Sequence, residues 1–530
     1  MAKGSTNTIV VVGGKSGASS FTVPSCANVT ARSASGKIYI KWTDPDNIYD
    51  GGKLISWTKS EVRLIVSSSS DDDAYPKKVT DGTLVGTFTT KNQYKTTELE
   101  FTPPSTIGAD ANCRIMVYAH CSIAGDTKDY VNGEYEAQAS AQFQIKSYST
   151  WTVIIDESNS NPLSCCTYAD DAVGMTKGSD EWDEIFGYKP CVFKDGAVYK
   201  YLNPNDFTKF ADGTDATNYM SMTTSYASVQ GYDVMIEFPR MGLKITNANN
   251  KITISLTDNP NSEDFRYYAH ESNGVAKNTF YLGAYDGWIT NAYQSKNTLR
   301  SLSGSTYTTG GLTIFEAATS RSNYCILAFY QMLYIQALYI VKYGNLNSQV
   351  AVGNGAVGVT TALKAGTMDA NGMCYGNTTN QTTGMKLFGL EHLWGNVPQW
   401  VCGVRLDSST SVSNRIALFT TTNVQASTTT ATYQEQGVLS TTLSGTQAGY
   451  IKTVFGTTGA GFVSNYKTGS GSATTYYCDY TSLTALYPAG TVRFGYFGGG
   501  SDSGDSAGIF QCYINYNSSN SGLTSRLMYL

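Results

Sequence analysis

The sequence predicts a multidomain protein that is mainly β with some α structure, and three observations support this. Short segments that alternate apolar and polar residues, with turn residues between them, fill positions 26–148. One long apolar segment, residues 324–341, predicts a helix. Hydrophobic residues make up 41% of the 530 residues and charged residues only 15%. The chain can therefore build sizeable cores, and Ser, Thr, Asn, Gln and Gly must supply most of its polar surface.

Charge and cysteine content exclude several classes of function. The net charge of −5 gives no reason to expect a nucleic-acid partner. The eleven cysteines are odd in number and include no Cys-x-x-Cys pair, so we expect buried free thiols rather than a zinc site or a disulfide framework. The three histidines are scattered through the chain. We expect no metal and no cofactor.

Residues 1–25 are rich in Gly, Ser and Thr around the apolar run Ile9–Val12. We interpret them as an N-terminal anchoring arm, either flexible or donated as a strand to a neighbouring subunit. The first residues lack the basic-then-apolar order of a signal peptide. This favours assembly in a cytoplasm and release by lysis, as virions are released.

Residues 26–148 predict a β-sandwich. Segments 37–42, 61–66 and 113–119 alternate in the manner of half-buried strands, and turn residues follow at 43–46. Strands at this spacing without a helical segment are typical of two packed sheets.

Residues 149–295 predict a further β-rich region, in which 252–257 is the clearest alternating strand. Acidic residues gather between Asp156 and Glu184, and two facing carboxylates would suit glycoside cleavage. Nothing in the pattern brings two of them together, so solvated turns and helix starts are the plainer interpretation.

Residues 296–530 form the last predicted domain. The helix expected over Tyr324–Tyr343 ends at Gly344 and is apolar almost all round, so it should be buried. Gln331 and Gln336 interrupt the apolar run, which argues against a membrane span. Further on, Trp394 and Trp400 should pack in the core, with Asn396 fastening a turn.

The final segment, from Arg493 to Leu530, predicts a binding face. Phe510, Cys512 and Ile514 alternate with Gln511, Tyr513 and Asn515, so one face should enter a core and the other should be presented. Tyr, Ser, Asn and Gly dominate here, the mixture that adaptable recognition surfaces use. The candidate contact residues are Tyr496, Ser501, Asp502, Asp505, Gln511, Tyr513, Asn515, Tyr516 and Asn517.

Two motifs carry a resemblance to a known family. Gly395-Asn-Val-Pro-Gln-Trp400 is similar to the Gly-Asn-Val-x-Glu-Trp motif of the formylglycine-generating-enzyme and C-type-lectin-like folds, with Gln399 in place of Glu. The end of the chain resembles the C-type-lectin-like domain of phage receptor-binding and tail-fibre proteins and of the variable proteins of diversity-generating retroelements, through Arg493-Phe-Gly, Gly498-Gly-Gly-Ser, Ala507-Gly-Ile-Phe and Ser525-Arg526-Leu527. The scaffold residues that this resemblance implies are Gly395, Asn396, Trp400, Arg493 and Arg526.

Within residues 26–148, Ile40-Lys-Trp-Thr-Asp-Pro-Asp46, Asp81-Gly-Thr-Leu-Val85 and Tyr118-Ala-His resemble fibronectin-type-III-like modules of phage tail proteins, which mostly act as spacers. Together the two resemblances imply a fibronectin-III-like sandwich followed by an α+β C-type-lectin-like domain, with residues 149–295 as the β-rich first part of the lectin-like region and 296–530 as the receptor-binding domain. The implied protein belongs to the virion, in a tail, baseplate or head fibre, and binds a bacterial surface glycan or protein non-covalently. Its implied partners are that receptor and other virion proteins, which the N-terminal part contacts. A homo-oligomer, with a trimer favoured, is also implied.

Two other functions stay open at this point. A head-decorating or tail-assembly protein could use the same fold without touching a receptor. An enzyme, either a depolymerase or an oxidase, is the third reading. Enzymes among the relatives use a pair of active-site cysteines, and no motif here carries such a pair over, so we expect no enzymatic activity.

Overall fold

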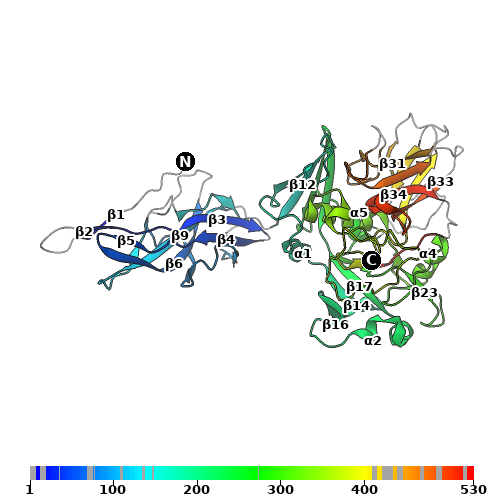
Figure 1. Ribbon diagram of the computed structural model, residues 1–530, viewed down its shortest axis with the longest axis horizontal. Coiled ribbons are helices and arrows are strands. Elements are labelled where there is room, and N and C mark those ends of the chain that lie inside the picture. The colour runs from blue at the N-terminus through cyan, green and yellow to red at the C-terminus, as the bar shows by residue number, and fades with distance from the viewer. Residues whose placement is uncertain are drawn as a thin grey trace. The chain divides into compact units, whose positions relative to one another are not determined.

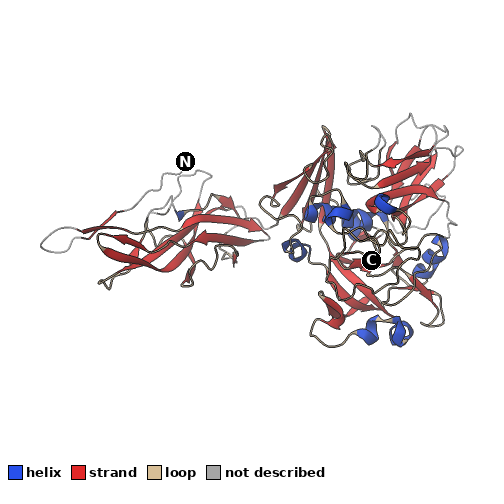
Figure 2. Cartoon of the chain, in the orientation of Figure 1, coloured by secondary structure: helices blue, strands red, loops and turns tan. Residues whose placement is uncertain are grey.

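A computed structural model describes residues 8–11, 19–34, 36–67, 76, 78–104, 106–107, 111–133, 138–145, 148–272, 274–408, 415–419, 434–438, 446–465, 471–484, 492–516 and 522–530. Strands dominate these residues, and helices are few (Figure 2). The chain divides into two compact units, Met1–Ser149 and Thr150–Leu530. The boundary that the sequence suggested at residue 295 falls inside the second unit.

The first unit contains two sheets and a hairpin (Figure 1). The hairpin pairs β1 (Thr8–Val11) with β2 (Ser19–Thr22), so β1 finds its partner strand within this chain. The smaller sheet has the order β3 (Ala27–Ala34), β4 (Lys37–Thr43), β8 (Leu99–Phe101). The larger sheet is built on β6 (Lys53–Ser67) and β9 (Asn112–Ile123), with β5 (Ile48–Asp50), β7 (Thr83–Phe88), β10 (Tyr130–Val131) and β11 (Phe143–Gln144).

The alternating strands of the first unit meet in one core. Ile38, Ile40 and Trp42 of β4 are buried against Val62 of β6 and Ile115 of β9. Each of these strands turns alternate residues inward because successive side chains of a strand point to opposite faces. Strands of both sheets thus contribute to one shared core.

The second unit is organised by three larger sheets. One has the order β13 (Cys166–Asp170), β12 (Thr150–Asp156), β19 (Lys251–Thr257), β18 (Gly242–Ala248), and β19 confirms the predicted strand. The central sheet has the order β16 (Asp206–Phe210), β15 (Ala197–Asn203), β14 (Lys189–Lys194), β17 (Tyr232–Pro239), β22 (Thr279–Gly283), β35 (Leu527–Tyr529), β25 (Tyr324–Ile326). Because β35 pairs with β22 and β25, the end of the chain closes a sheet begun more than 300 residues earlier.

The third sheet, called here the C-terminal sheet, holds most of the predicted binding segment. Its order is β30 (Gln434–Val438), β29 (Arg415–Phe419), β28 (Gln399–Ser408), β33 (Val492–Gly498), β34 (Gly508–Tyr516), β32 (Tyr480–Thr484), β31 (Thr446–Tyr450). The pairing of β32 with β34 is parallel, whereas the other pairs are antiparallel.

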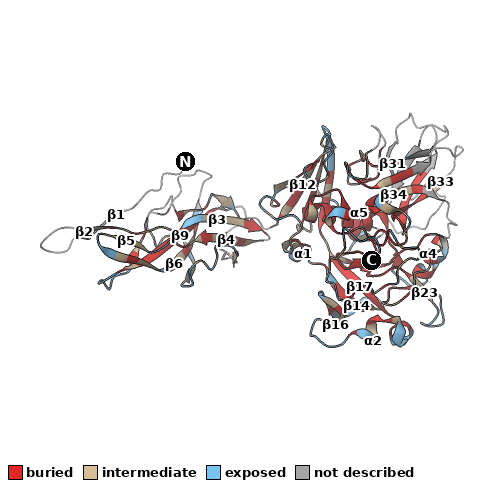
Figure 3. Ribbon diagram, viewed as in Figure 1, coloured by how far each residue is buried: buried red, intermediate tan, exposed pale blue. Residues whose placement is uncertain are grey.

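Helix α5 (Phe329–Tyr343) is the buried helix that the sequence predicted, and nearly all of it is shielded from solvent (Figure 3). It contacts β28 of the C-terminal sheet on one side and β12 and β19 on the other, so no face is left for polar residues. Gln331 and Gln336 fit because their amides donate to the carbonyl oxygens of Ala269 at 2.7 Å and Ile509 at 2.8 Å. The predicted start was wrong, since Tyr324–Ile326 pairs with β35 as strand β25.

The remaining elements are short. The helices are α1 (Glu181–Phe186), α2 (Thr217–Met220), α3 (Tyr226–Gln230), α4 (Gly311–Thr319) and α6 (Ser348–Ala351), and the two-stranded sheets pair β20 (Glu271–Ser272) with β21 (Val275–Ala276), β23 (Trp288–Thr290) with β24 (Thr298–Arg300), and β26 (Lys386–Leu387) with β27 (Leu390–Glu391). In the described ranges, no helix combines the length and apolarity that crossing a bilayer requires. All eleven cysteines are free; ten are buried and Cys374 is half-buried, which confirms the predicted thiols.

Candidate functional site

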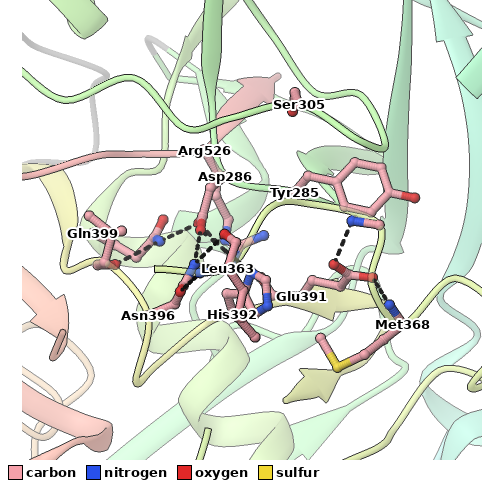
Figure 4. A network of polar contacts seen from close by, with 12 residues as sticks. Tyr285, Asp286, Ser305, Leu363, Met368, Glu391, His392, Asn396, Gln399 and Arg526 are labelled. Carbon is pink, nitrogen blue, oxygen red and sulfur yellow. Dashed lines mark hydrogen bonds and ion pairs between the residues drawn. The ribbon is translucent and has the colours of Figure 1, made fainter. Parts of the chain in front are cut away.

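Two of the predicted scaffold residues, Asn396 and Arg526, build one buried polar network with Asp286 and Gln399, as Figure 4 shows in part. Asp286 follows β22 and accepts hydrogen bonds from Gln399 Nε2 at 2.6 Å and Asn396 Nδ2 at 3.2 Å. Arg526 Nη2 lies 3.3 Å from the same carboxylate, and its Nη1 donates to the carbonyl of Ala284 at 2.9 Å. Gln399 thus donates to the central carboxylate.

Burial dominates the electrostatics of this network. It raises the pKa of Asp286, and the Arg526 charge and the two amides oppose that shift. Burial, with a contribution from Arg526, lowers the pKa of the adjacent His392 to about 3, so its imidazole is neutral at pH 7. Removing Arg526 would leave an unpaired carboxylate in a site that excludes water. The network therefore fastens β35, β28 and the segment after β22 to one another.

Glu391 extends the network toward a loop. Its two carboxylate oxygens accept from the backbone N–H groups of Gly366 at 2.8 Å and Met368 at 3.0 Å (Figure 4). Burial, followed by the Asp369 charge, raises the pKa of Glu391 to about 7, a value that a general acid could use. However, Glu391 is fully buried and both of its oxygens are engaged by the loop, so its contacts describe a structural anchor.

Gly395 and Trp400 hold the scaffold by close packing. Gly395 has a φ of +74°, and a side chain there would meet Val357 at 2.9 Å. Trp400 is 3% exposed and lies so close to Gly311 of α4 that a Cβ on that glycine would be 1.7 Å from the indole. Arg493 lies on β33 opposite Leu406 and is half-buried, apart from the Asp286 network. The predicted burial of Trp394 and Trp400 is confirmed.

The predicted binding strand has the expected alternation on its core side only. Phe510, Cys512 and Ile514 are buried, and the Phe510 ring lies 5.9 Å from that of Tyr339 on α5. On the other face, Tyr513 is half-buried, but Gln511 is only 1% exposed, so its predicted presentation was wrong.

A turn that follows β33 covers Gln511. A Cβ on Gly499 would come within 1.9 Å of Gln511 Oε1, which shows how closely the turn lies over the amide. Tyr496 is also buried, at 7% exposure, so its predicted presentation was wrong too. The ring of Tyr513 lies parallel to that of Tyr496 and covers it, with centroids 5.0 Å apart.

The other predicted contact residues fall in two places. Ser501 is half-buried and Asp502 and Asp505 are exposed, all in the turn after β33. Asn515 and Tyr516 belong to the backbone of β34, with side chains outside the described part, and Asn517 lies outside the described residues.

Four tyrosines cross the outer face of the C-terminal sheet as a row, called here the tyrosine row. Its members, one from each of four adjacent strands, are Tyr450, Tyr480, Tyr513 and Tyr496. Tyr450 pairs directly with Tyr480, and their ring centroids lie 5.3 Å apart. Tyr480 and Tyr513 stack at 6.2 Å, and Tyr513 stacks on Tyr496 with an interplanar angle of 11°. All except Tyr496 are half-buried and keep part of the ring in solvent.

The turn that carries Asp505 lies close enough to the tyrosine row for the two to interact electrostatically. The pKa of Tyr450 is raised by desolvation and then by the Asp505 charge, which places that exposed carboxylate near the phenol. The sequence analysis missed Tyr450 and Tyr480, because their strands precede the final segment and only sheet pairing brings them beside Tyr513. Repeated Tyr in otherwise Ser-, Thr- and Gly-rich strands was the available signal.

Neither family models nor curated proteins give a match to this chain.

Proposed function

We propose that this chain is a virion protein that attaches a bacteriophage to a bacterial surface, binding a receptor non-covalently through the tyrosine row and the turn that carries Asp502 and Asp505. The proposed domains are a fibronectin-III-like spacer in the first unit and a C-type-lectin-like head in the second. The observation that carries the proposal is the tyrosine row: four rings at fixed spacing on a sheet locked by the buried Asp286 network.

Two physical arguments favour binding at this surface. Tyrosine gives large contact area with few rotatable bonds, so little conformational entropy is lost when a ligand docks. Tyr480, Tyr513 and Tyr496 stack in turn and Tyr450 meets Tyr480 edge-on, and these contacts fix the orientation of the rings before binding. Such a surface suits the faces of sugar rings or a protein epitope, and no covalent step is required.

The test is binding of the labelled full-length chain to a panel of bacterial strains, scored by flow cytometry. We expect saturable binding to a subset of strains and at least a tenfold loss of affinity when Tyr480 and Tyr513 are both changed to Ala. Tyr49→Ala is the matched control, because this tyrosine is 78% exposed in the first unit. Binding that survives the double substitution would remove the tyrosine row from the proposal.

Immunolabelling of intact virions separates attachment from a purely structural role. An antibody against the second unit should reach it at an exposed tip. A location beneath neighbouring subunits of a head or collar would support the structural alternative.

A further inference from the structure

A concave surface lies in the Thr150–Leu530 unit, and none of the residues proposed for attachment lines it. It is an open cavity of about 350 Å³. Its walls come from the β14–β15 turn, the segment that follows β23, the segment that follows α4, and Tyr529 of β35. Figure 1 locates β14, β23 and α4, the elements from which these segments emerge. A volume of this size holds one or two sugar units or another small polar molecule.

Cations outnumber carboxylates in and behind this cavity. Arg321 and Lys296 line it, and Arg300 lies behind them with its side chain fully buried. The facing carboxylates are Asp195 on the rim and Asp233, which is also fully buried.

Asp233 pairs with both guanidinium groups, Arg300 at 3.0 Å and Arg321 at 3.2 Å. One buried carboxylate thus compensates two cations, and the low local dielectric lets the excess positive charge act on a ligand.

These cations have N–H donors that could still bind a ligand. Among the described residues, Arg300 Nη1 and Arg321 Nε are buried without a hydrogen-bond acceptor. Lys296 is exposed, and within the described ranges its ammonium forms no hydrogen bond or ion pair. Buried donors without acceptors are rare in folded proteins and call for an explanation. A bound anion would offset the excess charge and give Lys296 a partner.

Aromatic rings and amides complete the lining. Tyr293 and Tyr529 are half-buried, and the Tyr293 hydroxyl donates to Asp195 Oδ1 at 2.9 Å. The Arg321 guanidinium lies 3.8 Å from the centroid of the Tyr324 ring, which fixes its orientation. Gln294 and Asn323 add exposed amides. Aromatic walls with a few polar groups and a cation suit a sugar that carries an acidic group better than a bare inorganic anion.

The rim is built from unusual backbone. Three lining residues, Asp195, Gln294 and Asn323, have φ between +49° and +65°, the left-handed region that residues other than Gly rarely adopt. Such backbone is destabilising, least for Asp and Asn, and such residues cluster at ligand sites. Their concentration around one cavity is a second observation, independent of charge.

We propose that this cavity binds an anionic saccharide, one sugar unit bearing a carboxylate, with Lys296 and Arg321 facing the carboxylate and Tyr293 and Tyr529 packing against the ring. The site is separate from the tyrosine row, so the inference goes beyond attachment through that row and stands without it.

Titration calorimetry on the full-length chain tests the proposal with four probes: methyl glucuronide, methyl glucoside, glucose 6-phosphate and inorganic phosphate. We expect the glucuronide to bind with a dissociation constant on the order of 1 mM. It should bind at least tenfold more tightly than the neutral glucoside, and affinity should fall as NaCl is raised from about 0.05 to about 0.5 M. Equal affinity for glucuronide and glucoside would overturn the proposal. Inorganic phosphate binding as tightly as the glucuronide would overturn its saccharide part, and glucose 6-phosphate binding more tightly would overturn the choice of a carboxylate.

Variants locate the binding. Lys296→Gln and Asn323→Gly should each weaken glucuronide binding at least threefold; glycine keeps the left-handed backbone at 323 while removing the amide. Lys364→Gln is the matched control, an exposed lysine outside this cavity, and Tyr513→Ala should leave glucuronide affinity unchanged. Folding of each variant is checked by circular dichroism. Unchanged affinity in both Lys296→Gln and Asn323→Gly would refute the site.

Discussion

Tyr496 and Tyr513 stack across β33 and β34 with ring centroids 5.0 Å apart and planes within 11° of parallel, and one ring is buried beneath the other. The buried Tyr496 ring therefore supports and orients the ring of Tyr513, which remains half-buried. At this pair, a ring that keeps part of its surface in solvent packs directly on a buried ring of the C-terminal sheet.

Within the tyrosine row, substituting the buried Tyr496 should cost more stability than substituting a half-buried member. We expect Tyr496→Ala to lower the free energy of unfolding by about 3–4 kcal/mol, as for other buried aromatic residues. Tyr480→Ala, at a half-buried ring, should cost about 1 kcal/mol. Urea unfolding monitored by tryptophan fluorescence measures both. Equal costs would mean that Tyr496 is not buried in solution.

The Asp286 network should behave as a buried ion pair. Arg526→Ala leaves the Asp286 carboxylate buried without its cation, so we expect a loss of about 3–5 kcal/mol. The comparison pair is Lys200 and Asp212, which lie 2.7 Å apart at the surface. Lys200→Ala should cost less than about 1 kcal/mol, because solvent screens that pair. A small loss for Arg526→Ala would contradict the scaffold role of the network.

His270 should make the free energy of unfolding fall as the pH falls below 6.5. Burial lowers its pKa from 6.5 to about 3, so the unfolded state binds a proton more readily than the folded state. The stabilisation is complete above pH 6.5 and is lost as pH falls toward 3. His270→Phe should fit beside Phe280 and Tyr334 and make the slope of unfolding free energy against pH shallower by up to about 1.4 kcal/mol per pH unit.

The control for His270→Phe is its effect at neutral pH. There it should cost only about 1 kcal/mol, for the lost contact with the Phe238 carbonyl. Parallel pH profiles of the variant and the parent chain, measured by urea unfolding between pH 4 and 7, would exclude a buried neutral imidazole.

Gly311 and Trp400 should be coupled. Gly311→Ala places a methyl group 1.7 Å from the indole, so we expect a loss of about 2 kcal/mol or more despite the better helix propensity of Ala. Trp400→Leu frees that space. The loss of unfolding free energy in the double variant should therefore be smaller than the sum of the losses in the two single variants. Strict additivity in thermal unfolding would show that α4 can move away from Trp400.

Much of the fold was predictable where local pattern and burial agree. The strands around Ile38 and Ile252 were found from alternation, because one face of each meets a core. Helix α5 was found from its length and apolarity, but its start was not, since Tyr324–Ile326 is apolar enough for a helix and pairs with β35 instead. Pairing with a strand some 200 residues away leaves no mark in the local pattern.

The sequence by itself determined which residues are apolar, that strands run near Ile38 and Ile252, that a buried helix precedes Gly344, and that the final segment is rich in Tyr, Ser, Asn and Gly. Only the tertiary structure decided which of those residues reach solvent: it buried Tyr496 and Gln511, joined Tyr480 to Tyr513, and gathered Arg526, Asn396 and Gln399 around Asp286. The physical reason is that alternation fixes which face a side chain takes, whereas exposure depends on what covers that face. The strands and turns that cover it come from distant parts of the chain.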